Sequence, residues 1–388
     1  MKTSGFHGSC APEIASLRSS RLFIHSLLTN SGTVAGGQVG IETAGGSIGA
    51  LTNQAGGIVT GTAYHAVFVD SGTVGALANA GTLQGGASGV YNASGVVTAV
   101  SNSGSITGST SLGLQNVGGV IGGITNTGTI GGIGNFAFGT IGTGTGLAIS
   151  STGSAATIGE LYNQGFINGG VTVANQDLLV HGNASPTFGV FQNRTITVLD
   201  GSLTFVDGST YLDSDVVVSS AGGVAGLGTM TNQGELILGA ARQLDGSFAQ
   251  TAAGVFTAAL FDASNYGSLV ATGTAAFDGT LNLEEDGLSL AGGRTFNLFA
   301  FAASLGDFAA LAVDGTVLTS LGGGQWAYGS LILTETLTAT SLSISVTATA
   351  VPEIDPRSFG GVVALVIGSL SLIERRNRRR GAAVGTAG

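Results

Sequence analysis

A nine-residue pattern recurs through the first half of the chain and restricts the folds open to it. The pattern is an apolar residue, any residue, Asn, a small residue, Gly, any residue, an apolar residue, any residue and Gly. Its clearest copies begin at Leu28, Leu77, Val100, Ile124 and Leu161. Asn tolerates the left-handed conformation and hydrogen-bonds to its own backbone, and Gly adopts positive φ freely. Each Asn-x-Gly segment therefore predicts a tight corner between short strands.

The Asn positions form two interleaved series with a period in the twenties. One series advances in steps of 23, 26, 23 and 24 residues, and the other in steps of 22 and 24. The first contains Asn30, Asn53, Asn79, Asn102 and Asn126, and the second contains Asp70, Asn92 and Asn116. Such a period is typical of a solenoid, and stacked coils would place equivalent Asn side chains about 4.8 Å apart. We therefore expect two similar corners in each coil and a ladder of Asn side chains.

These patterns predict an all-β fold, a right-handed parallel β-helix with a β-rich C-terminal cap. In the general character of its sequence only, the repeat region resembles the passenger domains of filamentous-haemagglutinin-like and autotransporter proteins. The predicted parts are an N-terminal segment (1–27), β-solenoid repeats (28–240), the cap region (241–350) and a C-terminal signal (351–388). An antiparallel β-sandwich or barrel remains an alternative, because its turn signals also recur every 8–12 residues.

The composition excludes several classes of protein. Of 388 residues, 69 are Gly and only 9% are charged, yet Gly does not fall at every third position and Pro is scarce, so the chain is not collagen-like. No Lys or Arg occurs between Asn30 and Val180, so this part of the chain has no positively charged patch that could bind the phosphates of nucleic acid. Cys10 is the single cysteine, so no intramolecular disulfide can form.

Two histidines are candidates for acid–base chemistry. His65 lies near Tyr64 and Asp70 in the sequence, and His181 lies near Asp177. Either could act as a base in a carbohydrate-cleaving β-helix, but neither accompanies a nucleophile motif. We expect both histidines to be structural.

Acidic pairs are the other candidates. Asp213 and Asp215 alternate on one strand and could be the paired carboxylates of a glycosidase, although a solvated edge is the simpler interpretation. The segment Glu284–Gly287 could bind Ca²⁺, but it lacks the alternating ligand spacing of a calcium loop and favours a hairpin turn. The Gly-rich run Gly142–Gly146 has no Lys after it, so it is not a phosphate loop. We expect no catalytic, cofactor or metal site.

The end of the chain has three consecutive parts. A short motif, Val351–Pro356, contains two prolines that fix φ and favour an extended peptide. An apolar run of 15 residues, Phe359–Ile373, follows and predicts a single helix about 22 Å long, shorter than the roughly 30 Å core of a bilayer. A basic stop in residues 374–380 comes last, and its arginines favour the cytoplasmic side: Arg375, Arg376, Arg378, Arg379 and Arg380.

This tail resembles the PEP-CTERM class of bacterial sorting signals in its Val-Pro-Glu-Ile-Asp variant. The matching motif residues are Val351, Pro352, Glu353, Ile354 and Asp355, with the apolar run and the basic stop in the same order. The resemblance implies export, transient residence in the inner membrane and recognition by an exosortase, a membrane transpeptidase that cuts near the motif. It also implies a host that makes exopolysaccharide.

The N-terminal segment does not match the expectation of export. Lys2 is basic, but no apolar run of 7–15 residues follows it, and the nearest candidate, Leu22–Leu28, is interrupted by His25 and Ser26. The start is truncated or misassigned, the signal is weak, or the protein stays inside the cell.

The function predicted from the sequence is that of an exported, non-enzymatic and adhesin-like protein of the cell surface or extracellular matrix. Its expected partners are the exosortase and exopolysaccharide, and no nucleic acid. The alternatives are a polysaccharide-degrading β-helix enzyme and a solenoid that stays anchored, uncleaved, in the inner membrane.

Overall fold

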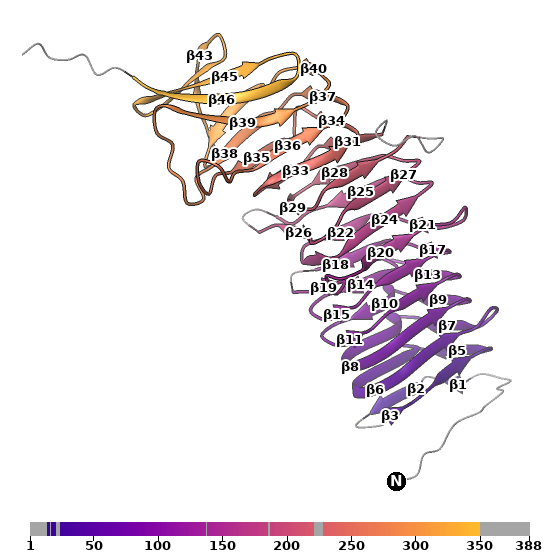
Figure 1. The fold of residues 1–388 in the computed structure, drawn as a ribbon. Coiled ribbons are helices and arrows are strands. Elements are labelled where there is room, and N and C mark those ends of the chain that lie inside the picture. The colour runs from indigo at the N-terminus through magenta and orange to yellow at the C-terminus, as the bar shows by residue number, and fades with distance from the viewer. Residues whose placement is uncertain are drawn as a thin grey trace, which may run out of the picture. The chain divides into compact units, whose positions relative to one another are not determined.

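The chain forms a β-solenoid of about 11 turns in a computed structural model, with strands stacked coil upon coil (Figure 1). The structure describes residues 14–15, 17–20, 24–136, 138–184, 187–220 and 228–349. Within them, every regular element is a β-strand. The strands that link successive coils pair in parallel, from β1 with β5 to β38 with β41. The solenoid prediction is thus confirmed, and the antiparallel alternative is wrong.

The strands form four longitudinal faces, which we number in the order in which the chain visits them. Face 1 comprises β2 (Leu17–Ser20), the first part of β6 (Ile41–Asn53) and of β8 (His65–Asn79), β10 (Ser88–Asn92), β14 (Leu114–Asn116), β18 (Ile133–Asn135), β22 (Leu161–Asn163), β25 (Leu178–His181), β28 (Leu203–Asp207), β31 (Thr229–Asn232), β34 (Ser247–Gln250), β37 (Thr274–Phe277) and β40 (Ala303–Gly306).

Faces 2 and 3 follow face 1 in each coil. Face 2 comprises β3 (Ile24–His25), the middle of β6 and of β8, β11 (Val96–Val97), β15 (Val120–Ile121), β19 (Thr140–Ile141), β23 (Phe166–Asn168), β26 (Gly189–Gln192), β29 (Ser209–Asp213), β32 (Glu235–Leu238), β35 (Val255–Ala259), β38 (Thr280–Glu284) and β41 (Ala310–Val313). Face 3 comprises β4 (Leu28–Asn30), the ends of β6 and β8, β12 (Val100–Asn102), β16 (Ile124–Asn126), β20 (Leu147–Ser151), β24 (Gly170–Ala174), β27 (Ile196–Leu199), β30 (Val216–Val218), β33 (Ala241–Asp245), β36 (Ser268–Ala271) and β39 (Arg294–Ala300).

Among the described residues, face 4 is a sheet of seven strands in the N-terminal part of the stack. It comprises β1 (Ile14–Ala15), β5 (Thr33–Gly36), β7 (Ile58–Gly61), β9 (Thr82–Gly85), β13 (Ser105–Gly108), β17 (Thr129–Ile130) and β21 (Thr157–Ile158). After β21, the strands of the described residues follow one another from face 3 to face 1 of the next coil. Parallel pairing continues past residue 240 into the region predicted as cap, where β33 pairs with β36 and β38 with β41.

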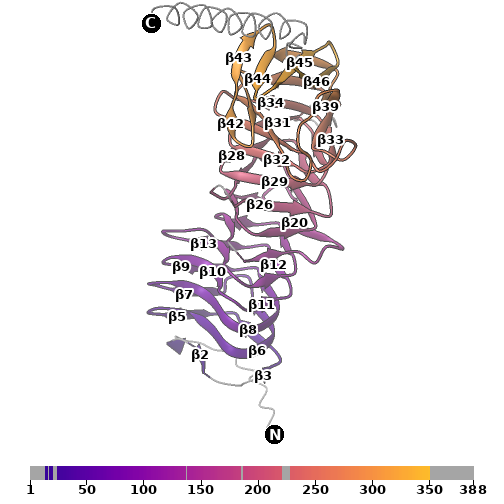
Figure 2. The ribbon, with the colours of Figure 1, turned by 90° about the vertical axis from the view of Figure 1, so that its left-hand side faces the viewer.

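Antiparallel strands lie at the C-terminal end of the stack (Figure 2). They are β42 (Thr316–Val317), β43 (Thr319–Gly322), β44 (Gln325–Tyr328), β45 (Leu331–Leu337) and β46 (Ser341–Ala348). Strand β46 pairs with β39, and β44 pairs with both β43 and β45. This group gives β39, the last strand of face 3, a hydrogen-bonded neighbour on its outer edge.

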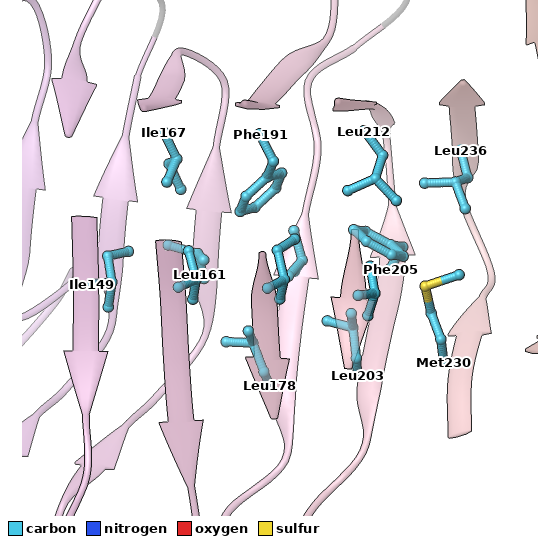
Figure 3. Close-up of a cluster of buried hydrophobic side chains, with 14 of the residues drawn as sticks. Ile149, Leu161, Ile167, Leu178, Phe191, Leu203, Phe205, Leu212, Met230 and Leu236 are labelled. Carbon is cyan, nitrogen blue, oxygen red and sulfur yellow. The ribbon is translucent and has the colours of Figure 1, made fainter. Parts of the chain in front are cut away.

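The core is a set of columns in which each coil contributes one or more inward apolar side chains per face. Figure 3 shows part of it, including Ile167, Phe191, Leu212 and Leu236 from successive strands of face 2. None of these side chains is more than 1% exposed. The alternation of inward apolar and outward polar residues along each strand produces these columns, because successive side chains point to opposite sides.

The first Asn series forms a hydrogen-bonded ladder at the corner between faces 3 and 4. The side-chain NH₂ of each Asn donates to the Oδ1 of the Asn in the next coil, at 2.8 Å in all four steps. The ladder runs through Asn30, Asn53, Asn79, Asn102 and Asn126 and ends on the hydroxyl of Ser151. This part of the sequence prediction is confirmed.

The second series forms a ladder at the corner between faces 1 and 2, but Asp70 is not part of it. Asn92 donates to Asn116, Asn116 to Asn135, and Asn135 to Asn163. The register partner of Asn92 in the preceding coil is Val69. A shift of one residue moves a strand side chain to the opposite face, so Asp70 is exposed. Its inclusion in the series was wrong.

The glycines two residues after the ladder Asn do not adopt positive φ, contrary to the prediction. Neither the ladder asparagines nor Gly81, Gly104 and Gly128 are among the described residues with positive φ. These positions need glycine because coils approach closely there. A Cβ on Gly104 would lie 2.0 Å from the carbonyl oxygen of Gly81, and one on Gly128 would lie 2.2 Å from that of Gly104. Stacking distance, and not turn geometry, selects glycine at this corner.

Candidate functional site

A polar groove crosses the corner between faces 2 and 3 in successive coils. Its volume is about 560 Å³. The lining residues come from the turn between β19 and β20, the turn between β26 and β27, the segment around the end of β29, and β33: Gly144, Asn193, Arg194, Thr195, Asp213, Ser214, Asp215 and Arg242. The groove therefore exists only because the coils stack.

Asp213 and Asp215, the carboxylates predicted as a pair, both line this groove. Asp213 forms a salt bridge with the guanidinium of Arg242. Asp215 lies just beyond β29, and its Oδ1 accepts a hydrogen bond from the backbone N–H of Gln243 at 2.9 Å. The two acids thus do not share one strand as predicted, because β29 ends at Asp213, but the stacking gives each of them a partner in the next coil.

Arg194 lies in the turn that precedes β27. Its guanidinium donates to the carbonyl oxygen of Thr145, 2.8 Å away, and no salt bridge to it occurs among the described residues. The preceding residue, Asn193, adopts a φ of 76° and donates its side-chain NH₂ to Asn168. These contacts hold the turn against the two preceding coils.

Two aromatic rings adjoin the groove on face 2. Tyr211 precedes Asp213 by two residues on β29, so both side chains point outward from the same side of the strand. The ring of Phe188 stacks on Tyr211 with centroids 5.3 Å apart, and Phe188 is 41% exposed. Burial, together with the nearby charge of Asp213, raises the pKa of Tyr211. The two rings therefore lie beside Asp213, although neither is among the residues that line the groove.

His181 lies in a separate cluster on face 1. Its Nδ1 is 3.0 Å from Asp207 Oδ1, and its Nε2 is 3.6 Å from Glu160 Oε2. Its ring stacks on Tyr162 at 4.3 Å. Asp177, its neighbour in the sequence, instead accepts hydrogen bonds from the backbone and hydroxyl of Ser202. Coil stacking, not sequence proximity, supplies the carboxylates around this histidine.

The hydroxyl of Tyr162 completes this cluster. It donates to Glu160 Oε2 at 2.6 Å. That hydrogen bond, followed by burial, raises the pKa of Tyr162 to about 12. The arrangement ties three successive coils together through stacked rings and hydrogen bonds.

His65 is held by aromatic side chains. Its ring stacks on Tyr91 at 4.4 Å and lies 5.5 Å from Phe68. Burial lowers its pKa. Among the described residues no hydrogen bond joins it to Asp70, and its buried Nδ1 has no partner. Within the part of the chain that the structure describes, no ion pair joins His65 to a carboxylate.

The acidic segment at Glu284 closes a turn at the end of β38. The backbone N–H of Glu285 donates to Asp314 Oδ1 at 2.8 Å, and the Glu285 carboxylate accepts from the backbone of Leu290. Burial and the charge of Asp286 raise the pKa of Glu284. Across the described part of the chain, no three His, Cys, Asp or Glu side chains converge as metal ligands would.

Several predicted features lie outside the described residues. They are Cys10, the sorting motif Val351–Asp355, the apolar run Phe359–Ile373 and the arginines of the basic stop. Within the described residues, the structure contains no helix with the length and apolarity needed to cross a bilayer. Neither a scan against protein-family models nor a search of curated proteins finds a match for the chain.

The sequence did not point to Arg194, Arg242 or Phe188 as site residues. One signal was available, because arginine is scarce. The described residues contain four arginines, and two of them line the same groove.

Proposed function

We propose that the protein is an exported, non-enzymatic β-solenoid of the cell surface or extracellular matrix, with an adhesin-like role. The observation that carries the proposal is the three-part C-terminal tail. Its motif begins at Val351, three residues after the last strand, β46, ends at Ala348. Proteases and transpeptidases act most readily on chain that lies beyond a folded body, which is where the proposal places the cut.

The solenoid supports this role. Asn ladders join its successive coils, and the chain is almost free of charge between residues 30 and 180. We expect the coil to be right-handed, as crossover connections between parallel strands almost always are. The antiparallel strands β42–β46 would act as the cap, because an open end exposes unpaired strand edges that aggregate.

The proposed partners follow from the tail. An exosortase-type transpeptidase would recognise Val351–Asp355. The helix predicted at Phe359–Ile373 would hold the chain in the inner membrane during processing, and the five arginines of the basic stop would keep the C-terminus inside. After cleavage the solenoid is released to the surface, where it contacts exopolysaccharide.

Intact mass and cell fractionation in the native host test the proposal. The expected species ends within Val351–Pro356 and is found outside the inner membrane. A variant with Pro352→Ala and Glu353→Ala should accumulate at full length, whereas Arg357→Ala, just beyond the motif, should be processed normally. A full-length protein in the inner membrane would leave an uncleaved anchor, and a full-length cytoplasmic protein would refute export.

A polysaccharide-degrading activity is the second candidate, and the presence of Asp213 and Asp215 in one groove favours it. A glycosidase needs one carboxyl as acid and another as base or nucleophile. Release of reducing ends from polysaccharide by the wild type, lost in Asp213→Asn, would support this alternative. Against it stand the salt bridge of Asp213 and the backbone hydrogen bond of Asp215, which engage both groups.

A further inference from the structure

The groove at the corner of faces 2 and 3 concentrates charge in a chain that otherwise avoids it. It brings together Arg194, Arg242, Asp213 and Asp215. In a stacked repeat, a charge at a recurrent position would face its own copy at about 4.8 Å, which costs on the order of 1 kcal/mol even in water. The four groups avoid that penalty because opposite charges alternate between coils. Their presence here is an exception to the composition of the whole protein.

Two polar atoms in the groove have no hydrogen-bond partner. The Ser214 hydroxyl is buried and unpaired, and Ser214 is only 3% exposed. The Nε of Arg242 is also buried and unpaired, although its terminal nitrogen binds Asp213. Buried polar groups are nearly always hydrogen-bonded in proteins. Both atoms are enclosed by protein groups, so they mark the polar character of the corner and do not by themselves identify a ligand.

The charges in the groove balance, and this selects the kind of ligand. Two guanidinium groups and two carboxylates leave no net charge, whereas the whole chain carries −10. A polyanion would therefore meet long-range repulsion without local compensation. Carboxylates accept hydrogen bonds from hydroxyls, and guanidinium groups donate to hydroxyl oxygens. A neutral polyol fits such a mixture of planar donors and acceptors.

The aromatic rings supply an apolar surface beside the groove. Phe188 and Tyr211 stack on each other beside Asp213, with the Phe188 ring partly open to solvent. A pyranose ring has an apolar face of C–H groups and an edge of hydroxyls. Its apolar face can pack on an aromatic ring while its hydroxyls reach the charged groups. The groove volume of about 560 Å³ lies in the range of small-ligand sites, roughly 300–1,000 Å³.

We propose that this groove binds a segment of a neutral hexose polysaccharide, with Phe188 and Tyr211 as the stacking platform and Arg194, Asp213 and Asp215 as hydrogen-bonding groups for sugar hydroxyls. The proposal rests on the proposed surface role and gives it a ligand class and a site. Because the groove crosses several coils, the polymer would lie along the long axis of the stack.

Calorimetric titration of the purified full-length chain tests the site. The probes are neutral hexose oligomers, namely β-1,3-linked glucose, β-1,4-linked glucose and α-1,6-linked mannose, and oligogalacturonate as the anionic comparison. We expect one neutral oligomer to bind and oligogalacturonate not to bind. Phe188→Ala and Arg194→Gln should each weaken binding by about tenfold. Phe138→Ala removes a ring that is 84% exposed and outside the groove, and should leave binding within twofold.

Thermal unfolding of the same variants separates loss of the site from loss of the fold, and both site variants should unfold within about 2 °C of the wild type. The proposal is overturned if no neutral oligomer binds, if oligogalacturonate binds in their place, or if Phe188→Ala and Phe138→Ala behave alike. Cleavage of the oligomer during the titration would also overturn it in favour of the enzyme. Binding failure in a protein correctly exported and processed refutes the groove alone, because export is measured by fractionation.

Discussion

Removing one side chain from the Asn ladder should destabilise the coils around it. Asn102 is 1% exposed and sits in the middle of the ladder. Its NH₂ donates to Asn126 Oδ1 at 2.8 Å, to Thr129 O at 3.0 Å and to Gly104 O at 3.2 Å, and its Oδ1 accepts from Asn79 at 2.8 Å. Asn102→Ala removes these four hydrogen bonds together.

The magnitude follows from what remains after the substitution. A hydrogen bond contributes roughly 1 kcal/mol net, and a buried polar group left without a partner costs roughly 1–3 kcal/mol. The Asn79 NH₂ keeps two backbone acceptors, Gly81 O and Ser105 O, so it is not orphaned. The Oδ1 of Asn126 loses its ladder donor inside the stack. We expect a loss of about 3 kcal/mol in the local free energy of opening.

Native-state hydrogen exchange is the appropriate assay, because stacked repeats open locally and a single global transition is not assured. Protection of amides in β8, β12 and β16 should fall, while that of amides in β36 should not change. Ser101→Ala is the matched control, since Ser101 is the outward, exposed neighbour of Asn102 on the same strand. A difference of less than about 0.5 kcal/mol between Asn102→Ala and Ser101→Ala would refute the energetic role of the ladder.

Two further substitutions test other features of the stack. Gly85→Ala places a Cβ 1.8 Å from the carbonyl oxygen of Ser88, so it should lower the free energy of unfolding measured in urea by about 1–3 kcal/mol. Gly37 has open space around it, so Gly37→Ala should leave that free energy unchanged. Equal effects of the two substitutions would contradict the argument from close coil approach. Burial, and then the Asp307 carboxylate, raises the pKa of Glu335 to about 8, so the folded protein holds a proton that the unfolded chain releases near pH 4.5. Stability should therefore fall as pH rises from 4.5 to 8, and Glu335→Gln should flatten that slope; an unchanged slope in the variant would exclude Glu335 as its source.

The repeat was readable from sequence where the coil length stays nearly constant. In the first ladder, from Asn30 to Asn126, successive members are 23 to 26 residues apart and every member is an Asn. The second ladder continues from Asn116 by a step of 19 residues and then by one of 28. Insertions and deletions in the turns of a solenoid leave the stacking unchanged but remove the constant spacing, so the second series could be followed in the sequence only as far as Asn116.

The same irregularity hid the partners of His181 and the members of the groove. Asp207 meets His181 across a register shift between β25 and β28, and a bulge of this kind cannot be read from spacing. The residues that line the groove are spread along the chain between Gly144 and Arg242, in turns and strands of different coils. Only the order of coils in space brings them together.

The sequence by itself determined that the chain is built of short strands joined at Asn corners. The alternating stretches and the near absence of charge favoured strands that stack on copies of themselves, and the parallel pairing in the structure excluded the antiparallel alternative. The tertiary structure alone decided which residues meet across coils, why glycine is needed beside the ladder, and where Arg194, Arg242, Asp213 and Asp215 converge. The physical reason is that alternation and corner residues act within one coil, whereas register between coils depends on the length of each turn and on packing along the whole stack.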